Sequence, residues 1–409
     1  MKNWKNIPIE AWLAFILSSL FYALQFALRV SPGVMTDELM AAFGVDAVTL
    51  GVLVSFYYYG YAPFQVPAGM FLDRFGSRMT FLVSLMVCFL GGLLFTTGHL
   101  FSAYLGRFLM GLGSAASFLI CMKVVSEFFP KSMFPGLTSF AMLIGTVGAV
   151  GGGEPLALST NHFGWSKTMM GLSLLCFLLF AFTMVLFRKG QDNPDAGDEL
   201  EQRFIDRVKK VLKAKHTWFA GIYGILMYVP LSAFCDLWGI PFMEKFYGLP
   251  EETAARSVSL IYVGLGLFSL ASPVLLSKLG SYKKTFLLSS AASALVFFAI
   301  LMKPTTNLYA VYLMMFLLGG CLSPQILAFA FISERNSARM SGFANGIHNM
   351  LCMLSGVLAQ PLIAVLLHYV SATPDEISGR TFQICLGTIL VSIVAAGAVS
   401  LALPEEKPS

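Results

Sequence analysis

The strongest constraint on this chain is a series of twelve apolar segments, each long enough to cross a lipid bilayer as a helix. Barrel strands would be about half as long and would alternate apolar with polar residues. Only 12% of the residues are charged, whereas soluble proteins carry about a quarter. The sequence therefore predicts an all-α membrane protein with twelve transmembrane helices, at residues 9–33, 47–70, 79–98, 102–128, 132–158, 164–187, 217–241, 252–277, 285–302, 307–332, 340–368 and 381–403.

Basic residues are concentrated in alternate connections between these segments. With the N-terminus inside, the cytoplasmic connections and termini hold 19 of the 27 Lys and Arg residues, and the outer connections hold 5. The positive-inside rule then predicts that both termini are cytoplasmic. The N-terminus runs into the first apolar segment without a small-residue cleavage site, so we expect a retained first helix. With its compact loops, the chain is expected to be a multi-pass protein of a bacterial inner membrane.

A polar stretch at residues 188–216 separates six apolar segments from six others. It predicts an N-terminal six-helix bundle at residues 1–187 and a C-terminal one at residues 217–409. The stretch itself fits either an amphipathic helix on the inner leaflet or a solvated linker helix.

An internal repeat supports this division. The connection after the second segment reads DRFGSRMTF from Asp73, and the one after the eighth reads SKLGSYKKTF from Ser277. Glu127 and Glu334 end the fourth and tenth segments, again about half a chain apart. Two parallel six-helix repeats around a central cavity are typical of transporters.

A motif follows the second segment and reads Gly69-Met-Phe-Leu-Asp73-Arg74-Phe-Gly76-Ser-Arg78. Gly76 permits a tight turn between two membrane helices, and the Asp73 carboxylate can cap a helix N-terminus in the other half. The alternative is a basic turn with no gating role. The motif resembles the signature of the major facilitator superfamily, and this resemblance covers essentially the whole chain. It implies two pseudo-symmetric six-helix bundles with an inner gate formed by Asp73, Arg74, Arg78, Glu127 and Glu334.

Two other patterns resemble the same superfamily. Arg107-Phe-Leu-Met-Gly111-Leu-Gly113 lies in the fourth segment, where a charged residue usually faces a cavity or a partner. The fifth segment is rich in glycine and ends at Glu154-Pro155, but Thr146 stands where the family's antiporters carry a Gly-Pro step. That departure weakens the case for an antiporter.

A narrower resemblance rests on runs in the first two segments. These are Phe21-Tyr22-Ala-Leu-Gln25-Phe-Ala-Leu-Arg29 and Ser55-Phe-Tyr57-Tyr58-Tyr59 with Gln65 beyond it. They look similar to the phagosomal transporter family of intracellular bacteria, which imports amino acids or nucleosides, and to lysosomal dipeptide carriers.

Polar and aromatic side chains inside apolar segments indicate a water-filled cavity or polar contacts between helices, and for each single residue both interpretations stay open. Gln25 and Arg29 are four residues apart and share one helix face, as Tyr58 and Gln65 do at seven residues. The predicted substrate-binding residues are Tyr22, Gln25, Arg29, Tyr58, Gln65, Arg107, Tyr228, Asp236, Gln325, Asn345 and Asn349.

Arg29 and Asp236 stand at corresponding places in the two halves. They fit an ion pair at the outer side or contacts to the carboxylate and ammonium of a zwitterion, and Arg29 also fits snorkelling to the outer headgroups. Proton coupling needs a titrating group, for which Asp236, Glu154 and His348 are the candidates. With so few carboxylates in the apolar segments, proton symport and facilitated diffusion both remain open.

We therefore expect a secondary active or facilitative transporter that imports a small polar nutrient, an amino acid or a short peptide, by alternating access. The alternative is efflux of drugs or siderophores by proton antiport, and a receptor that keeps the fold without transport fits the intact gate motif poorly. The sequence has no Walker loop, no GxSxG motif and no CxxC spacing, so we expect no enzyme, cofactor or metal ion. The expected partners are the solute, protons if transport is coupled, and the bilayer. We expect no nucleic-acid partner and a monomeric protein.

Overall fold

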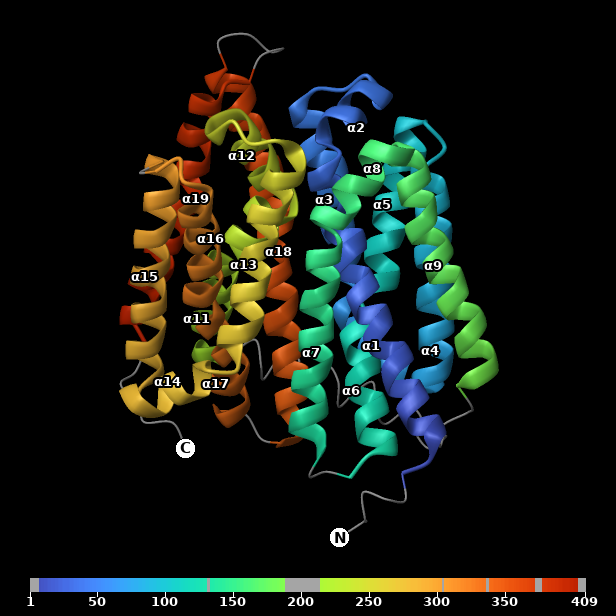
Figure 1. Ribbon diagram of the computed structural model, residues 1–409. Helices are drawn as coiled ribbons and strands as arrows, with labels where there is room; N and C mark the ends of the chain where they lie inside the picture. Colours follow the sequence, from blue (N-terminus) through green and yellow to red (C-terminus); the bar gives the residue numbers. More distant parts are fainter. Residues whose placement is uncertain are drawn as a thin grey trace. The chain divides into compact units, whose positions relative to one another are not determined.

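All regular elements of the protein are helices in the computed structural model, which describes residues 7–130, 133–187, 214–303, 305–335, 338–371 and 377–403 (Figure 1). Within these ranges ten helices are long and apolar enough to cross a bilayer, and two bent helix pairs raise the number to twelve. The pairs are Thr36–Phe43 with Ala47–Leu72, bent by 107°, and Glu251–Ser269 with Ser272–Leu279, bent by 54°. The predicted all-α membrane fold is confirmed.

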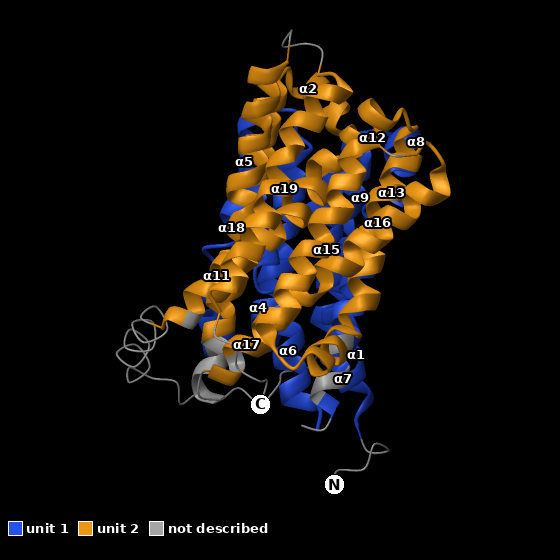
Figure 2. Cartoon of the chain, turned by 90° about the vertical axis from the view of Figure 1, so that its left-hand side faces the viewer, with its two compact units in different colours: residues 1–31, 56–200 blue, residues 32–55, 201–409 orange. Residues whose placement is uncertain are grey.

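The chain divides into two compact units, which Figure 2 shows in separate colours. Unit 1 comprises residues 1–31 and 56–200, and unit 2 comprises residues 32–55 and 201–409. The connection between the first two spans thus clusters with the C-terminal half of the chain. The predicted domain boundaries stay a prediction, and most of the predicted linker, residues 188–213, lies outside the described residues.

The helices of unit 1 come from the first six predicted spans. They are α1 (Ile9–Val30), the second part of α3 (Ala47–Tyr61), α4 (Gln65–Phe95), α5 (Leu100–Ser114), α6 (Ser117–Phe128), α7 (Phe134–Gly151), α8 (Glu154–Phe163) and α9 (Trp165–Leu186).

Unit 2 begins at Pro32 within the 3-10 turn η2 (Ser31–Val34) and continues with the short helix α2 (Thr36–Phe43) and the first part of α3. Its remaining elements are α11 (Lys215–Val229), the π-helix η4 (Pro230–Trp238), α12 (Gly239–Tyr247), α13 (Glu251–Ser269), α14 (Ser272–Leu279), α15 (Tyr282–Met302), α16 (Leu308–Leu322), η5 (Ser323–Ile326), α17 (Leu327–Arg335), α18 (Ala338–Val370) and α19 (Gly379–Leu401).

The repeat seen in the sequence recurs as paired glycine crossings. In unit 1, Gly60 of α3 lies against the carbonyl of Phe108 on α5, and Gly111 of α5 lies against the carbonyl of Tyr57 on α3. In unit 2 the same reciprocal contacts join α13 and α16, through Gly264 against Phe316 and Gly319 against Ile261. A Cβ at any of these glycines would meet backbone, so the absence of a side chain permits the close helix approach that membrane bundles rely on.

Both connections that carry the repeated motif turn at a glycine with positive φ. Gly76 has φ 79° and ψ 171° and breaks α4 into the ends of two spans. Gly280, its counterpart before α15, has φ 63°. Glycine adopts this region without the steric cost that a Cβ imposes, which confirms the predicted tight turn at Gly76.

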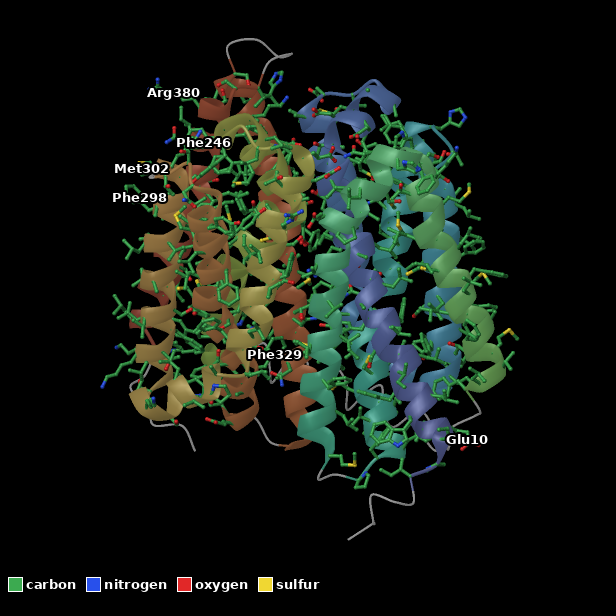
Figure 3. The ribbon with its side chains drawn as sticks, in the orientation of Figure 1. Glu10, Phe246, Phe298, Met302, Phe329 and Arg380 are labelled. Atoms are coloured by element: carbon green, nitrogen blue, oxygen red, sulfur yellow. The ribbon has the colours of Figure 1, made fainter. Side chains whose placement is uncertain are left out.

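Large apolar side chains cover much of the helix surface in both units. On α15, Phe298 and Met302 are about half exposed and point away from the other helices of unit 2 (Figure 3). On α9, Phe182 and Val185 are exposed as well. Such extensive apolar exposure suits contact with lipid rather than water.

Candidate transport site

In unit 1, the end of α1 carries the polar side chains Gln25 and Arg29, which are 1% and 2% exposed. The Tyr57 hydroxyl donates to Gln25 Oε1 at 3.0 Å and lies 3.3 Å from the Gln25 carbonyl oxygen. The Arg29 guanidinium lies over the Phe26 ring, 4.3 Å from its centroid. A guanidinium against an aromatic face gains a cation–π attraction, and its planar fork matches the geometry of a carboxylate.

Arg107 on α5 contacts the same end of α1. It is fully buried, and it donates to the carbonyl oxygens of Leu28 at 2.8 Å and Arg29 at 3.4 Å. Its guanidinium also lies 5.0 Å from the centroid of the Tyr57 ring. Carbonyls in the last turn of a helix lack partners in that helix, so Arg107 fixes the backbone that carries Arg29. Its predicted contact with substrate stays a prediction.

Three further predicted residues of unit 1 are buried. The Tyr22 hydroxyl lies 3.4 Å from Met142 Sδ, and its ring packs edge-on against Phe26. Tyr58 is fully buried with its ring against Tyr57, and Gln65 is 5% exposed at the first residue of α4. The glycines of α7 explain how α1 sits so close, because Gly145 lies against the Tyr22 ring and Gly148 against the backbone of Ala23.

In unit 2, Asp236 lies in the π-helix η4 and is fully buried. The Tyr262 hydroxyl of α13 donates to Asp236 Oδ1. η4 begins at Pro230, which has no N–H, and it ends where the Gly239 N–H donates to the Phe234 carbonyl five residues earlier. π-Helical segments inside α-helices are rare and are frequent at functional sites. Tyr262 was not among the predicted site residues, although the repeat pairs it with Tyr58.

Gln360 of α18 is a further residue that the sequence-based prediction missed as a site residue. It is fully buried, and its Nε2 donates to the Ser232 carbonyl of η4 at 2.7 Å. Its Oε1 accepts from the Ser55 hydroxyl at 3.2 Å, and its own carbonyl accepts from Trp238 Nε1 at 3.2 Å. The signal in the sequence was an amide next to Pro361 in an apolar segment, which alone does not reveal its partners.

His348 of α18 is 1% exposed, and its ring lies edge-on to Phe329, labelled in Figure 3, at 4.8 Å. Its Nε2 lies 3.5 Å from Cys352 Sγ. Among the described residues, His348 Nδ1 has no hydrogen-bond partner.

The other predicted residues of unit 2 are half-buried. Asn345 and Asn349 share α18 with His348, Gln325 lies in η5, and Tyr228 ends α11, where its carbonyl accepts from the Ser232 hydroxyl at 3.2 Å. In unit 1, the candidate Glu154 begins α8, where a carboxylate suits the helix dipole.

At the predicted inner end of each unit, a hydroxyl donates a hydrogen bond to the predicted gate glutamate. Ser77 donates to Glu127 at 2.7 Å in unit 1, and Tyr282 donates to Glu334 at 2.7 Å in unit 2. Arg78 donates to the Met184 carbonyl of α9 at 3.0 Å, and the exposed Arg74 lies over the Phe75 ring. The side chain of Asp73 lies outside the described part of the chain. Gating by these residues stays a prediction.

The part of the chain that the structure describes contains no group of three or more His, Cys, Asp or Glu side chains that could hold a metal ion. All seven cysteines are free thiols, and six of them are buried. The arrangement offers buried charges, amides and tyrosines for binding.

Comparison with known proteins identifies the family. The family model described as Major Facilitator Superfamily matches residues 11–360. The chain is 34% identical over 209 residues to the uncharacterized transporter YybO of Bacillus subtilis, covering 49% of this chain and 45% of that protein. It is 25% identical over 210 residues to the probable galactarate/D-glucarate transporter GudP of Bacillus subtilis, covering 48% of this chain and 44% of that protein. These matches span about half the length of the curated relatives.

Among solved structures, the fold is similar to that of the nucleoside transporter NupG. The TM-score is 0.77 with 15% identity, and the match covers 97% of this chain and 100% of that one. At this identity the likeness concerns the fold alone.

Proposed function

This chain belongs to the Major Facilitator Superfamily, and on that basis we propose that it transports a small polar nutrient bearing a carboxylate by alternating access. Amino acids and short peptides are the solutes that the sequence favoured. The relative GudP adds sugar acids such as galactarate and D-glucarate, which carry the same group. The protein would work in a bacterial inner membrane as a monomer with both termini in the cytoplasm.

The observation that carries this proposal is the buried guanidinium of Arg29. An arginine inside a membrane segment is costly and is retained where it meets a partner or a ligand. Here its backbone carbonyl is held by Arg107 and its guanidinium is backed by Phe26. This support would position the N–H fork for one carboxylate of the solute, which it would bind in bidentate fashion.

Asp236 supports a second part of the proposal, proton coupling. A fully buried carboxylate that accepts from Tyr262 can change its charge as its surroundings change. His348 and Glu154 remain the other candidates, and facilitated diffusion remains the uncoupled alternative. We expect Asp236→Asn to abolish accumulation driven by a proton gradient while exchange of solute across the membrane continues.

The test is uptake into proteoliposomes of labelled amino acids, dipeptides and sugar acids, with and without an inward proton gradient. We expect uptake of a carboxylate-bearing solute, competition by the free acid and none by its methyl ester. Arg29→Ala should raise KM about tenfold or more, because a hydrogen bond to a charged group contributes about 1.5–3 kcal/mol. Arg29→Lys should restore part of the affinity, since it keeps the charge but loses the fork. Equal uptake of acid and ester, or an unchanged KM in Arg29→Ala, would refute the proposal.

A second candidate function is efflux of drugs or siderophores by proton antiport. It is favoured by the aromatic side chains around Arg29, where Tyr22 and Phe26 lie edge to face at 5.2 Å and Tyr57 stacks on Tyr61 at 5.9 Å. Ligand-protected melting separates the two, because a bound ligand raises the melting temperature. Protection by lipophilic cations, with none by carboxylates, would favour efflux.

A further inference from the structure

Residues 32–55 join α1 to the second part of α3 along the chain, yet they pack inside unit 2. By the predicted orientation they form the outer connection between the first two spans. Two glycines allow the close approach. A Cβ at Gly33 would lie 3.2 Å from the Asp236 carbonyl oxygen, and one at Gly51 would lie 3.3 Å from both the Gln360 carbonyl oxygen and Trp238 Cζ2.

Polar contacts hold the same segment. Asp37 of α2 lies 3.9 Å from Lys245 Nζ of α12, with both side chains largely exposed. Such an exposed pair contributes little. The bond from Ser55 to Gln360 is buried. Ala47, Gly51 and Ser55 are spaced by four residues and therefore share one face of α3.

Gln360 is the point at which this segment meets η4. Its Oε1 accepts a hydrogen bond from the Ser55 hydroxyl, and its Nε2 donates one to the Ser232 carbonyl inside the π-helix. One planar amide thus contacts both groups at once. The Ser55 hydroxyl also lies 2.7 Å from the Gly51 carbonyl of its own helix, so rotating the amide away would cost chiefly the partners of the buried Gln360 side chain. Trp238, the last residue of η4, adds a third bond to the Gln360 backbone.

We propose that Gln360 is a positioning residue that couples the docking of residues 32–55 to the π-helical geometry of η4, and so to the setting of Asp236. In an alternating-access cycle, release of the segment and rearrangement of the Asp236 helix then occur together. This inference rests on the proposed transport cycle, but its test needs no substrate. Failure of carboxylate uptake and failure of this coupling are therefore distinguishable.

The test uses two cysteine reporters in the full-length protein in membrane vesicles. Ala47→Cys places a thiol on the docked face of α3, where Ala47 is 8% exposed, and the native Cys235 of η4 is 3% exposed. The rate of labelling by a membrane-impermeant maleimide is followed for each thiol by mass spectrometry. Gln360→Leu removes both side-chain bonds. Ser55→Ala removes the bond from the segment to Gln360 together with the bond from the same hydroxyl to the Gly51 carbonyl within α3, at 2.7 Å.

We expect both reporters to label faster in Ser55→Ala, by about fivefold, which is the equilibrium shift expected when one hydrogen bond is lost. Gln360→Leu should raise both rates further, and Ser55→Ala should add nothing in the Gln360→Leu background, because the two changes break the same bond. The matched control is Ser259→Ala on α13. It loses a buried hydroxyl bonded only within its own helix, and neither rate should change.

Faster labelling of Ala47→Cys with an unchanged rate at Cys235 would overturn the coupling, as would strictly multiplicative effects in the double variant. Elution of each variant as a single species in detergent shows that it has folded. If Gln360→Leu does not fold, Ser55→Ala alone decides the question. The coupling requires that both reporters label faster in Ser55→Ala, and faster labelling of only one reporter, or of neither, would refute it.

Discussion

At the scale of single residues, the two arginines near the end of α1 illustrate how one residue type takes two roles. The guanidinium of Arg29 lies against the Phe26 ring, whereas that of Arg107 donates hydrogen bonds to the carbonyls of Leu28 and Arg29. Sequence alone assigned both to the substrate. The backbone bonds of Arg107 depend on the path of α1 relative to α5, which no local pattern contains.

Arg107→Lys is expected to lower the melting temperature of the detergent-solubilised protein. The change keeps the charge but cannot reach two carbonyls with a planar fork, and each lost bond to a charged group costs about 1.5–3 kcal/mol. Arg380→Lys is the control, because Arg380 is exposed at the start of α19 (Figure 3). An unchanged melting temperature in Arg107→Lys would contradict the capping role.

Asp46 precedes α3, and its Oδ1 accepts from the Thr49 backbone N–H at 2.9 Å. The backbone and side chain of Thr49 lower the pKa of Asp46 below its ordinary value. The stabilisation by the ionised carboxylate is therefore present above the ordinary Asp pKa of about 3.9 and is lost as pH falls through the lowered value. We expect the melting temperature of the native protein to exceed that of Asp46→Asn at neutral pH and the gap to close below about pH 3.9.

Asp46→Ala removes the cap at every pH and should cost about 1 kcal/mol. A gap between the native protein and Asp46→Asn that widens in acid would show that the charge does not stabilise this helix start.

At the scale of elements, hydropathy predicted the spans because a bilayer imposes both their length and the helical pairing of their backbone. The turn at Gly76 was predicted for an equally local reason, the need for positive φ. The π-helix at Pro230–Trp238 and the fold of residues 32–55 into unit 2 were not predicted. Both are contacted by the Gln360 side chain, whose bonds join residues more than a hundred positions apart.

The glycine crossings make a prediction at this scale. Gly111→Ala places a methyl group against the Tyr57 carbonyl, and Gly319→Ala places one against Ile261. Overpacking of this kind costs about 1–3 kcal/mol, so both variants should melt at lower temperature. Gly171→Ala on α9 is the matched control, because a Cβ there meets nothing within 4 Å. If all three variants melt alike, the crossings do not set the helix spacing.

At the scale of the whole molecule, the two units have equivalent bonds from different donors at their predicted inner ends. Unit 1 uses Ser77 and unit 2 uses Tyr282, each bonded to a glutamate at the end of the fourth helix of its repeat. Ser77→Ala and Tyr282→Phe remove one hydroxyl each and leave the glutamates in place. Each change should cost about 1 kcal/mol, whereas Ser126→Ala, which loses a bond within α6 only, serves as the control.

Because the two bonds lie in separate compact units, we expect their effects on unfolding to add within about 0.5 kcal/mol in the double variant. The measurement is the unfolding free energy of the two single variants, the double variant and the native protein in the same detergent. A double variant that loses much more than the sum would mean that the two inner ends support each other. The predicted gate glutamates would then contribute to stability jointly rather than independently.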